Sequence, residues 1–158
     1  MVNVGDNAPD FKLPDSSGKN LTLNTFIGKW VVIYFYPKDM TSGCTMEALD
    51  FTSLKPNFET EGGVVIGISA DPPESHAKFT DKKKLTLILL SDEEKKTLEA
   101  YGVWQIKKMY GREFKGIVRS TYLIDPKGKI SFIWPKVKVE GHAEDVLSKL
   151  LELKSECY

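Results

Sequence analysis

The chain has 158 residues, a length that fits one hydrophobic core, and we expect a single domain over residues 1–158. Lysine and arginine together number 22, as do aspartate and glutamate, so the formal net charge is zero. A neutral domain has no basic field to attract nucleic acid or an anionic membrane, and neither partner is expected. The first twenty residues lack the apolar core of a signal peptide, and no stretch approaches the roughly twenty apolar residues of a membrane span, so we expect a cytoplasmic protein.

The cysteine and histidine content argues against a bound metal. Only Cys44 and Cys157 are present, far apart in the sequence, so there is no CxxC pair and no spacing typical of zinc ligands. His76 and His142 each stand alone on segments expected to be helical or to lead into a helix, where a surface or half-buried histidine is more frequent than a ligand or a base, so neither is assigned a catalytic role. No metal or other cofactor is therefore expected.

The first two thirds of the chain alternate between strand and helix patterns. Residues 30–36 form a continuous run of β-branched, aromatic and other apolar residues, which predicts a strand buried on both faces. The helix expected from Ser42 carries a core stripe at helical spacing, and Pro56 should kink or shorten it. The other elements expected here are a short strand at 21–23, a strand at 64–69, a helix at 74–84, a strand at 85–90 and a helix from 91 to about 101.

The last third of the chain has a different pattern. Residues 104–116 are basic and aromatic without clear periodicity, and we expect a loop or a short irregular piece there. Residues 119–124 and 129–134 flank an Asp-Pro-Lys-Gly turn, which predicts a hairpin, and apolar residues at helical spacing predict a closing helix over 143–154. Alternating strands and helices followed by a hairpin predict an α/β fold with a mixed central sheet flanked by helices.

Cys44 stands at the junction between the buried strand and the helix that follows it. Pro37 ends the strand, and a thiol just inside a helix start meets unpaired N–H groups and the positive end of the helix dipole, which favour the reactive thiolate. Thr41 comes about one helical turn earlier, so its hydroxyl can lie on the same side as the sulfur, and Gly43 lets a small molecule approach the backbone. A single cysteine in an apolar region is more often an inert core residue, but these neighbours favour the reactive alternative.

Five segments resemble the thioredoxin-fold peroxiredoxins, and most closely the bacterioferritin comigratory protein group, also called peroxiredoxin Q. They follow the family's order and extend over nearly the whole chain. The segments are residues 5–13 (GDNAPDFKL), 34–47 (YFYPKDMTSGCTME), 89–92 (LLSD), 101–104 (YGVW) and 119–125 (RSTYLID). The resemblance implies a thioredoxin-like fold and an antioxidant peroxidase that reduces hydrogen peroxide and organic hydroperoxides.

The resemblance also implies roles for five residues. Cys44 would be the peroxidatic cysteine, whose thiolate becomes a sulfenic acid, and Pro37 would shield its sulfur. Thr41 would hydrogen-bond the bound peroxide, while Arg119 would hold the thiolate and polarise the O–O bond. Glu47 would help to orient that arginine. These residue types suit the chemistry, because the leaving oxygen develops negative charge and needs donors that are placed before the reaction.

The chain departs from many members of the group in how the sulfenic acid is removed. Many have a resolving cysteine five positions after the first, where this chain has Leu49, and others have one in the following helix, where residues 77–83 contain none. Two cycles stay open: a one-cysteine cycle completed by thioredoxin or another external thiol, and resolution by Cys157, which can also be merely an exposed thiol. We expect a monomer or a weak dimer.

Two other functions stay open as alternatives to a peroxidase. A thioredoxin-like disulfide reductase needs a second thiol near Cys44, and the sequence has none close by. A peroxide-sensing or binding module of the same fold would react once without turnover. Repeated consumption of peroxide in the presence of dithiothreitol separates the peroxidase from both.

Overall fold

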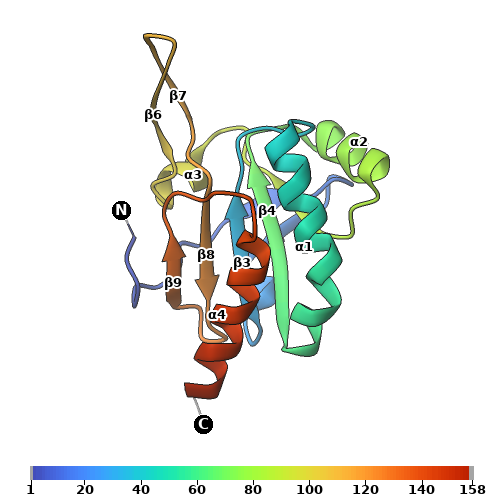
Figure 1. Cartoon of the computed structure of the whole chain (residues 1–158), viewed down its shortest axis with the longest axis vertical. Coiled ribbons are helices and arrows are strands. Elements are labelled where there is room, and N and C mark those ends of the chain that lie inside the picture. Colours follow the sequence, from blue (N-terminus) through green and yellow to red (C-terminus); the bar gives the residue numbers. More distant parts are fainter. Residues whose placement is uncertain (1, 157–158) are drawn as a thin grey trace.

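A central five-stranded sheet organises the computed structural model, which describes residues 2–156 (Figure 1). The strand order is β5-β4-β3-β8-β9. The strands β3 (Trp30–Phe35), β4 (Gly63–Ser69) and β5 (Ile88–Ser91) run parallel, whereas β8 (Ser120–Ile124) pairs antiparallel with β3 and with β9 (Ile130–Trp134). The predicted α/β fold with a mixed central sheet is confirmed.

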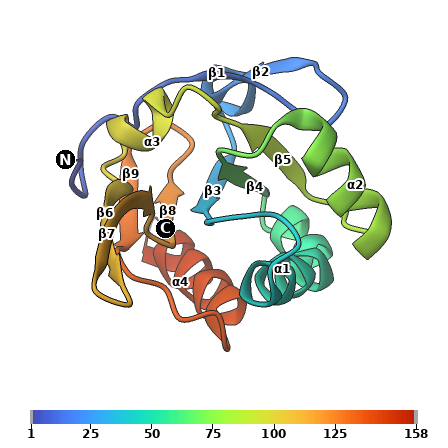
Figure 2. The ribbon, with the colours of Figure 1, turned by 90° about the horizontal axis from the view of Figure 1, so that it is seen from above.

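Helices cover both faces of this sheet. The helices α1 (Ser42–Thr60), α2 (Pro73–Lys83) and α4 (His142–Glu156) contribute to the core on one face, which also contains Cys44. The short helix α3 (Lys96–Ala100) packs on the other face, together with the N-terminal segment (Figure 2). That segment contains β1 (Lys12–Pro14), β2 (Asn20–Thr22) and the 3-10 helix η1 (Leu23–Phe26). All six residues of β3 are buried, as expected for a strand covered on both sides. Within residues 2–156, no helix combines the length and apolar character needed to cross a bilayer.

Residues 104–117 form a hairpin, so the expectation of a loop or irregular piece was wrong. The strands β6 (Trp104–Met109) and β7 (Arg112–Ile117) pair antiparallel outside the central sheet and project from the body of the molecule (Figure 1). Tyr110 and Gly111, with φ of 53° and 75°, form a two-residue turn that suits the twist of the two strands. Most side chains of both strands are exposed, and no apolar face alternates with a polar one, so the sequence carries no strand pattern.

The helix expected from residue 91 begins later than predicted. Ser91 is the last residue of β5, and Lys95 has a left-handed backbone with φ of 64°, so α3 starts only at Lys96. Asp92 Oδ2 accepts a hydrogen bond from Leu98 N at 2.8 Å. Residues 92–94, which are all acidic, therefore form a capping turn before α3 and are not the first turn of the helix.

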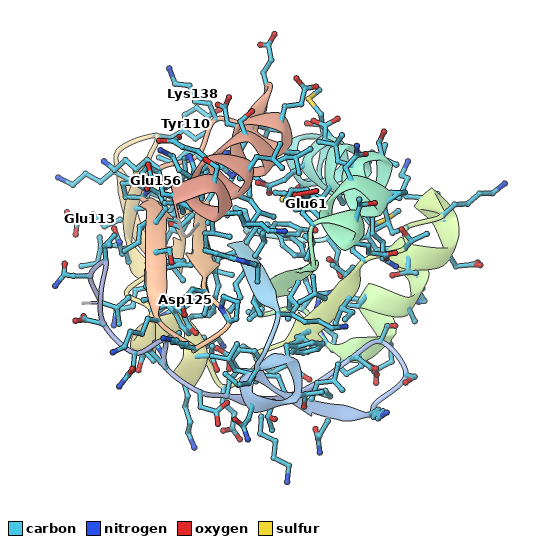
Figure 3. All side chains as sticks on the ribbon, turned by 90° about the horizontal axis from the view of Figure 1, so that it is seen from below. Glu61, Tyr110, Glu113, Asp125, Lys138 and Glu156 are labelled. Atoms are coloured by element: carbon cyan, nitrogen blue, oxygen red, sulfur yellow. The ribbon has the colours of Figure 1, made fainter. Side chains whose placement is uncertain are left out.

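The helix α1 continues past Pro56 to Thr60 and is not shortened there. Proline has no N–H, so one hydrogen bond of the helix is missing. The last turn is held instead by Phe58, which is fully buried, and by α4, whose Lys154 Nζ donates to the carbonyl oxygen of Glu61 at 2.7 Å. Figure 3 labels Glu61, directly after the end of α1. Packing against the sheet and α4 therefore outweighs the missing bond.

Gly67 in β4 lies against the ring of Tyr34. A Cβ atom at this position would be 2.7 Å from Tyr34 Cζ and 2.9 Å from a methyl group of Leu89. Because such contacts force the strand or the ring to shift, we expect Gly67→Ala to lower the free energy of unfolding by about 1–3 kcal/mol in urea titrations. Gly116→Ala in β7 is the matched control, since its Cβ would lie 3.0 Å from Cδ of the Lys107 side chain and 3.4 Å from the ring of Phe114, and both of these side chains can shift on a hairpin whose residues are mostly exposed. Equal losses in the two variants would contradict this account.

Candidate active site

Cys44 lies in the first turn of α1, directly after the loop that leaves the central strand β3. Thr41 is the N-cap residue, so Cys44 is the third residue of the helix, where the backbone N–H groups have no partner within the helix. Figure 2 looks down on this end of the molecule, where the loop after β3 reaches the start of α1. Cys44 is only 1% exposed. The strand-to-helix junction predicted from the sequence is present, and it encloses the sulfur.

Arg119 reaches the sulfur of Cys44 from a distant part of the chain. Because Ser120 of β8 pairs with Phe35 of β3, the residue before β8 lies next to the loop after β3. Arg119 Nη2 donates to Cys44 Sγ at 3.2 Å, and Nη1 donates to Glu47 Oε1 at 2.5 Å. The guanidinium group therefore joins the sulfur to a carboxylate.

Glu47 is buried one turn after the start of α1, with its side chain 1% exposed. Its Oε2 atom has no hydrogen-bond partner among the residues that the structure describes. Burial raises the pKa of Glu47 to about 7, although the charge and the hydrogen bonds of Arg119 act in the opposite direction. Burial alone would lower the pKa of Arg119, but the charges of Glu47 and of the Cys44 sulfur raise it overall. The guanidinium is thus a permanent cation beside the sulfur.

The loop before α1 carries two more of the predicted site residues. Thr41 Oγ1 donates to the carbonyl oxygen of Lys38 at 2.8 Å, so its proton is used within the loop. Pro37 follows the core residues of β3 and is half-buried. A Cβ atom on Gly43 would lie 3.3 Å from Arg119 Nη2, so the glycine allows the guanidinium to approach the helix start closely. Cys157, the other residue singled out from the sequence, lies outside the described residues.

Both histidines are buried, so the expectation of surface or half-buried positions was wrong. His142 Nε2 lies 2.7 Å from Thr121 Oγ1, and burial lowers the pKa of His142 to about 4, which leaves it neutral. His76 Nδ1 lies 2.7 Å from Asp39 Oδ2, and its Nε2 lies 3.0 Å from the carbonyl oxygen of Leu90. Partners from distant elements compensate for the burial, and no local pattern reveals them. The contact between His76 and Asp39 was not predicted from the sequence. The only signal for it was the position of Asp39 in the loop before α1.

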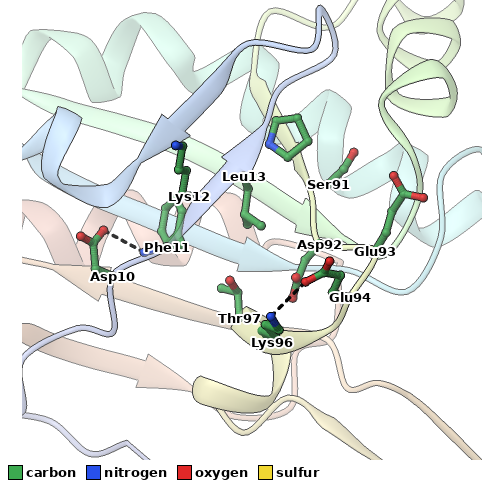
Figure 4. Close-up of a pocket in the computed structure, with 11 residues that line it drawn as sticks. Asp10, Phe11, Lys12, Leu13, Ser91, Asp92, Glu93, Glu94, Lys96 and Thr97 are labelled. Atoms are coloured by element: carbon green, nitrogen blue, oxygen red, sulfur yellow. Dashed lines mark hydrogen bonds and ion pairs between the residues drawn. The ribbon is translucent and has the colours of Figure 1, made fainter.

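A separate pocket of about 510 Å³ lies on the other face of the sheet (Figure 4). Its walls come from β1, the residues before it, and the turn that leads into α3. Phe11 and Leu13, which line it, belong to the core cluster that does not contain Cys44. Charged side chains surround its opening, and two of them, Lys96 and Glu94, pair at 3.2 Å. This pocket is therefore not part of the site around the sulfur.

Comparison with known proteins identifies the family. The profile of the AhpC/TSA family matches residues 4–133. The chain belongs to this family. It is a peroxiredoxin, and peroxiredoxins are thiol-dependent peroxidases, so the resemblance drawn from the sequence is confirmed.

Peroxiredoxins of the Bcp and PrxQ group are similar to this one over nearly its whole length. Peroxiredoxin Bcp of Bacillus subtilis is 44% identical over 152 residues, which cover 96% of this chain and 97% of the relative. A structure of Xanthomonas campestris bacterioferritin comigratory protein, described with alkyl peroxide reduction activity, has 43% identity, a TM-score of 0.86 and 90% coverage of both chains. A structure of a Xylella fastidiosa PrxQ mutant has 39% identity and a TM-score of 0.92, and covers 100% of this chain and 99% of that one.

The raised pKa of Glu47 makes the stability of this peroxiredoxin depend on pH. The ordinary value is 4.5 and the folded value is about 7, so the folded protein holds this proton more tightly than the unfolded chain does. The free energy of unfolding therefore falls as the pH rises through this range. We expect Glu47→Gln to remove that part of the fall, which is on the order of 3 kcal/mol between about pH 4.5 and 8. Urea unfolding of the wild type and of Glu47→Gln at several pH values measures this difference. The same pH dependence of the free energy of unfolding in both proteins would contradict the assigned contribution of Glu47.

Proposed function

We propose that this peroxiredoxin reduces hydrogen peroxide and organic hydroperoxides through the thiolate of Cys44, with Arg119 and Glu47 as its partners. The observation that carries the proposal is the guanidinium that donates to Cys44 Sγ at 3.2 Å and to Glu47 Oε1 at 2.5 Å. A cation and hydrogen-bond donor beside the sulfur favours the thiolate, which is the nucleophilic form. Glu47 holds that cation in place.

The reaction begins when the thiolate attacks one oxygen of the peroxide. An S–O bond forms while the O–O bond breaks, and the leaving hydroxide or alkoxide carries away the electron pair of the broken bond. The N–H groups of Arg119 stabilise the charge that develops on the leaving oxygen. This oxygen takes a proton from solvent and departs as water or an alcohol, and Cys44 is left as a sulfenic acid.

Thr41 and Pro37 complete the peroxide site in this proposal. Because the Thr41 hydroxyl already donates to Lys38 O at 2.8 Å, its oxygen would act toward a peroxide as an acceptor for the peroxide O–H. Pro37 would shield the sulfur from bulk water. The alkyl peroxide reduction described for the Xanthomonas campestris relative supports organic hydroperoxides as substrates.

We further propose that an external thiol, such as that of thioredoxin, re-reduces Cys44. A thiolate attacks the sulfenic sulfur, an S–S bond forms and water leaves, and a second thiol then breaks the mixed disulfide. Neither position 49 nor α2 holds a cysteine, which supports a one-cysteine cycle. The protein would act as a monomer or weak dimer in the cytoplasm, where thiols are kept reduced.

Turnover tests this function. Given dithiothreitol and a large excess of hydrogen peroxide or an organic hydroperoxide, the wild type is expected to consume peroxide until the thiol is exhausted. A sensing module would stop after one equivalent, and a disulfide reductase would consume disulfide instead. Peroxide loss that ends at one equivalent would refute the peroxidase.

Cys157→Ser distinguishes the two ways of completing the cycle. We expect this variant to retain peroxide turnover with dithiothreitol, because a small dithiol can attack the sulfenic acid directly. After one equivalent of peroxide, non-reducing electrophoresis and the intact mass show whether the wild type forms a bond between Cys44 and Cys157. An oxidised monomer with one added oxygen supports the one-cysteine cycle. A disulfide-linked species that is absent from Cys157→Ser would contradict it.

A further inference from the structure

A second buried polar cluster lies beside the active site, outside the atoms that react. It joins Asp39, in the loop between β3 and α1, to His76 of α2. Asp39 Oδ2 lies 2.7 Å from His76 Nδ1 and accepts a hydrogen bond from Ser75 Oγ at 2.7 Å, and Oδ1 accepts one from Tyr36 OH at 2.6 Å. Asp39 is 5% exposed and His76 is 0% exposed. The cluster therefore ties the loop to α2 with little contact with solvent.

Both ring nitrogens of His76 have polar partners. Its Nε2 lies 3.0 Å from the carbonyl oxygen of Leu90, and a carbonyl can only accept, so Nε2 is the donor of this bond. Its Nδ1 lies 2.7 Å from Asp39 Oδ2 and 3.2 Å from Tyr36 OH. Burial would raise the pKa of Asp39, but the contact with His76 lowers it overall. The two side chains form a buried pair, the Asp39–His76 pair, whose remaining polar atoms are also hydrogen-bonded.

The Asp39–His76 pair holds one end of an unusual stretch of backbone. Asp39 N donates to Asp71 Oδ2 at 2.8 Å, so Asp39 is fixed by its backbone as well as by its side chain. The next residue, Met40, has φ of 69°, a left-handed conformation that non-glycine residues rarely adopt. Thr41, the N-cap of the helix that carries Cys44, follows immediately. One residue in an uncommon conformation therefore separates the Asp39–His76 pair from the predicted peroxide site.

We propose that His76, acting through Asp39, is a positioning residue for the peroxidase reaction: it holds the loop before α1 so that Thr41 and the helix start face the peroxide. This inference rests on the proposed function and deepens it. His76 does not touch the sulfur. Because the Arg119 contact with Cys44 comes from the other side of β3, we expect loss of the Asp39–His76 pair to displace Thr41 and the loop more than it displaces that contact.

The same residues do not offer a ready metal site. Asp39, Asp71 and His76 bring ligand-type atoms within 4.8 Å of one another. However, Asp71 Oδ2 already accepts from Ser69 Oγ and from Asp39 N, both at 2.8 Å, and both nitrogens of His76 already lie within hydrogen-bond distance of protein oxygens. Hydrogen bonds occupy the atoms that a cation would need, so the cluster is better explained as an anchor for the loop.

Two rates measured on reduced His76→Gln test the proposal. One is the rate of Cys44 oxidation by hydrogen peroxide without reductant, and the other is the rate of alkylation by iodoacetamide, which needs the thiolate but not the peroxide geometry. We expect the peroxide rate to fall by about 10- to 100-fold, because small misplacements of positioning groups have effects of this size. Alkylation should be unchanged or faster, since a loosened loop exposes the sulfur. A merely structural role would not change the ratio of the two rates.

His142→Gln is the matched control, because His142 is also buried but bonds to Thr121 of β8 rather than to the loop. We expect both of its rates to stay within about two-fold of wild type. Asp39→Ala should show the same selective loss as His76→Gln, and it replaces that variant if His76→Gln does not fold. The double variant should be no slower with peroxide than the slower single variant, because both substitutions break the same contact between Asp39 and His76.

Two results would overturn the proposal. One is a peroxide rate within about two-fold of wild type in a folded variant of the pair, and the other is an equal loss of both rates. A wild-type protein that does not react with peroxide at all would instead overturn the proposed function. The failures of the two ideas are therefore distinguishable.

Discussion

Cys44→Ser is expected to abolish peroxide turnover. The sulfur supplies the nucleophile, whereas a serine hydroxyl is hardly ionised at neutral pH and forms no sulfenic acid for a thiol to reduce. We expect peroxide consumption with dithiothreitol to fall by more than roughly 10⁴-fold, to the rate of the reagents alone. A peroxide electrode measures this loss directly. Of all single substitutions in the chain, this one should have the largest effect on activity.

The control for this variant is Cys157→Ser, which removes the other thiol. Both variants should keep the wild-type circular dichroism spectrum and unfold at a similar urea concentration, because serine is close to cysteine in size. Peroxidase activity should be lost in Cys44→Ser and kept in Cys157→Ser. Full peroxidase activity in Cys44→Ser would show that a different residue attacks the peroxide.

Arg119→Ala is expected to slow the oxidation of Cys44 by about 10²- to 10³-fold, which is the usual cost of removing a donor to developing negative charge. The substitution removes the donor to Cys44 Sγ at 3.2 Å, and it leaves Glu47 buried without its cation. The first loss affects the reaction and the second affects stability. Stopped-flow oxidation and urea unfolding measure the two effects separately.

Two further variants sharpen this result. Arg119→Lys keeps the positive charge but not the fork of N–H groups that reaches both Cys44 and Glu47, so an intermediate rate is expected. Arg112→Ala removes the other arginine of the chain, which is exposed on β7, and should leave the rate unchanged. An Arg119→Ala protein that reacts with peroxide within about two-fold of the wild type would contradict the assigned role.

The elements that pack on the core could be predicted from the sequence. β3 and β4 are short apolar runs, and α1 and α4 carry apolar residues at helical spacing, so the local pattern of each element predicts its burial. The β6–β7 hairpin could not be predicted in this way, because its conformation depends on the Tyr110-Gly111 turn and on backbone pairing rather than on a buried face. The start of α3 was misplaced because acidic residues are equally common in a capping turn and in a first helical turn.

The site was predictable only in part from the residues themselves. Local sequence places Cys44 at a strand-to-helix junction, whereas the contact with Arg119 depends on the pairing of β3 with β8, and only the family resemblance anticipated it. The contact between Asp39 and His76 spans 37 positions and joins a loop to a helix. Neither a short motif nor a periodic pattern records such a contact, so it became visible only in three dimensions.

Cys44 is only 1% exposed, and this burial affects how fast the catalytic cycle can run. If the reducing thiol is carried by a folded protein, as proposed above, the first turn of α1 would have to move aside before that thiol could contact Cys44. With such a reductant, we expect the rate of this movement to limit the turnover rate, and tighter binding of the peroxide would not raise that limit.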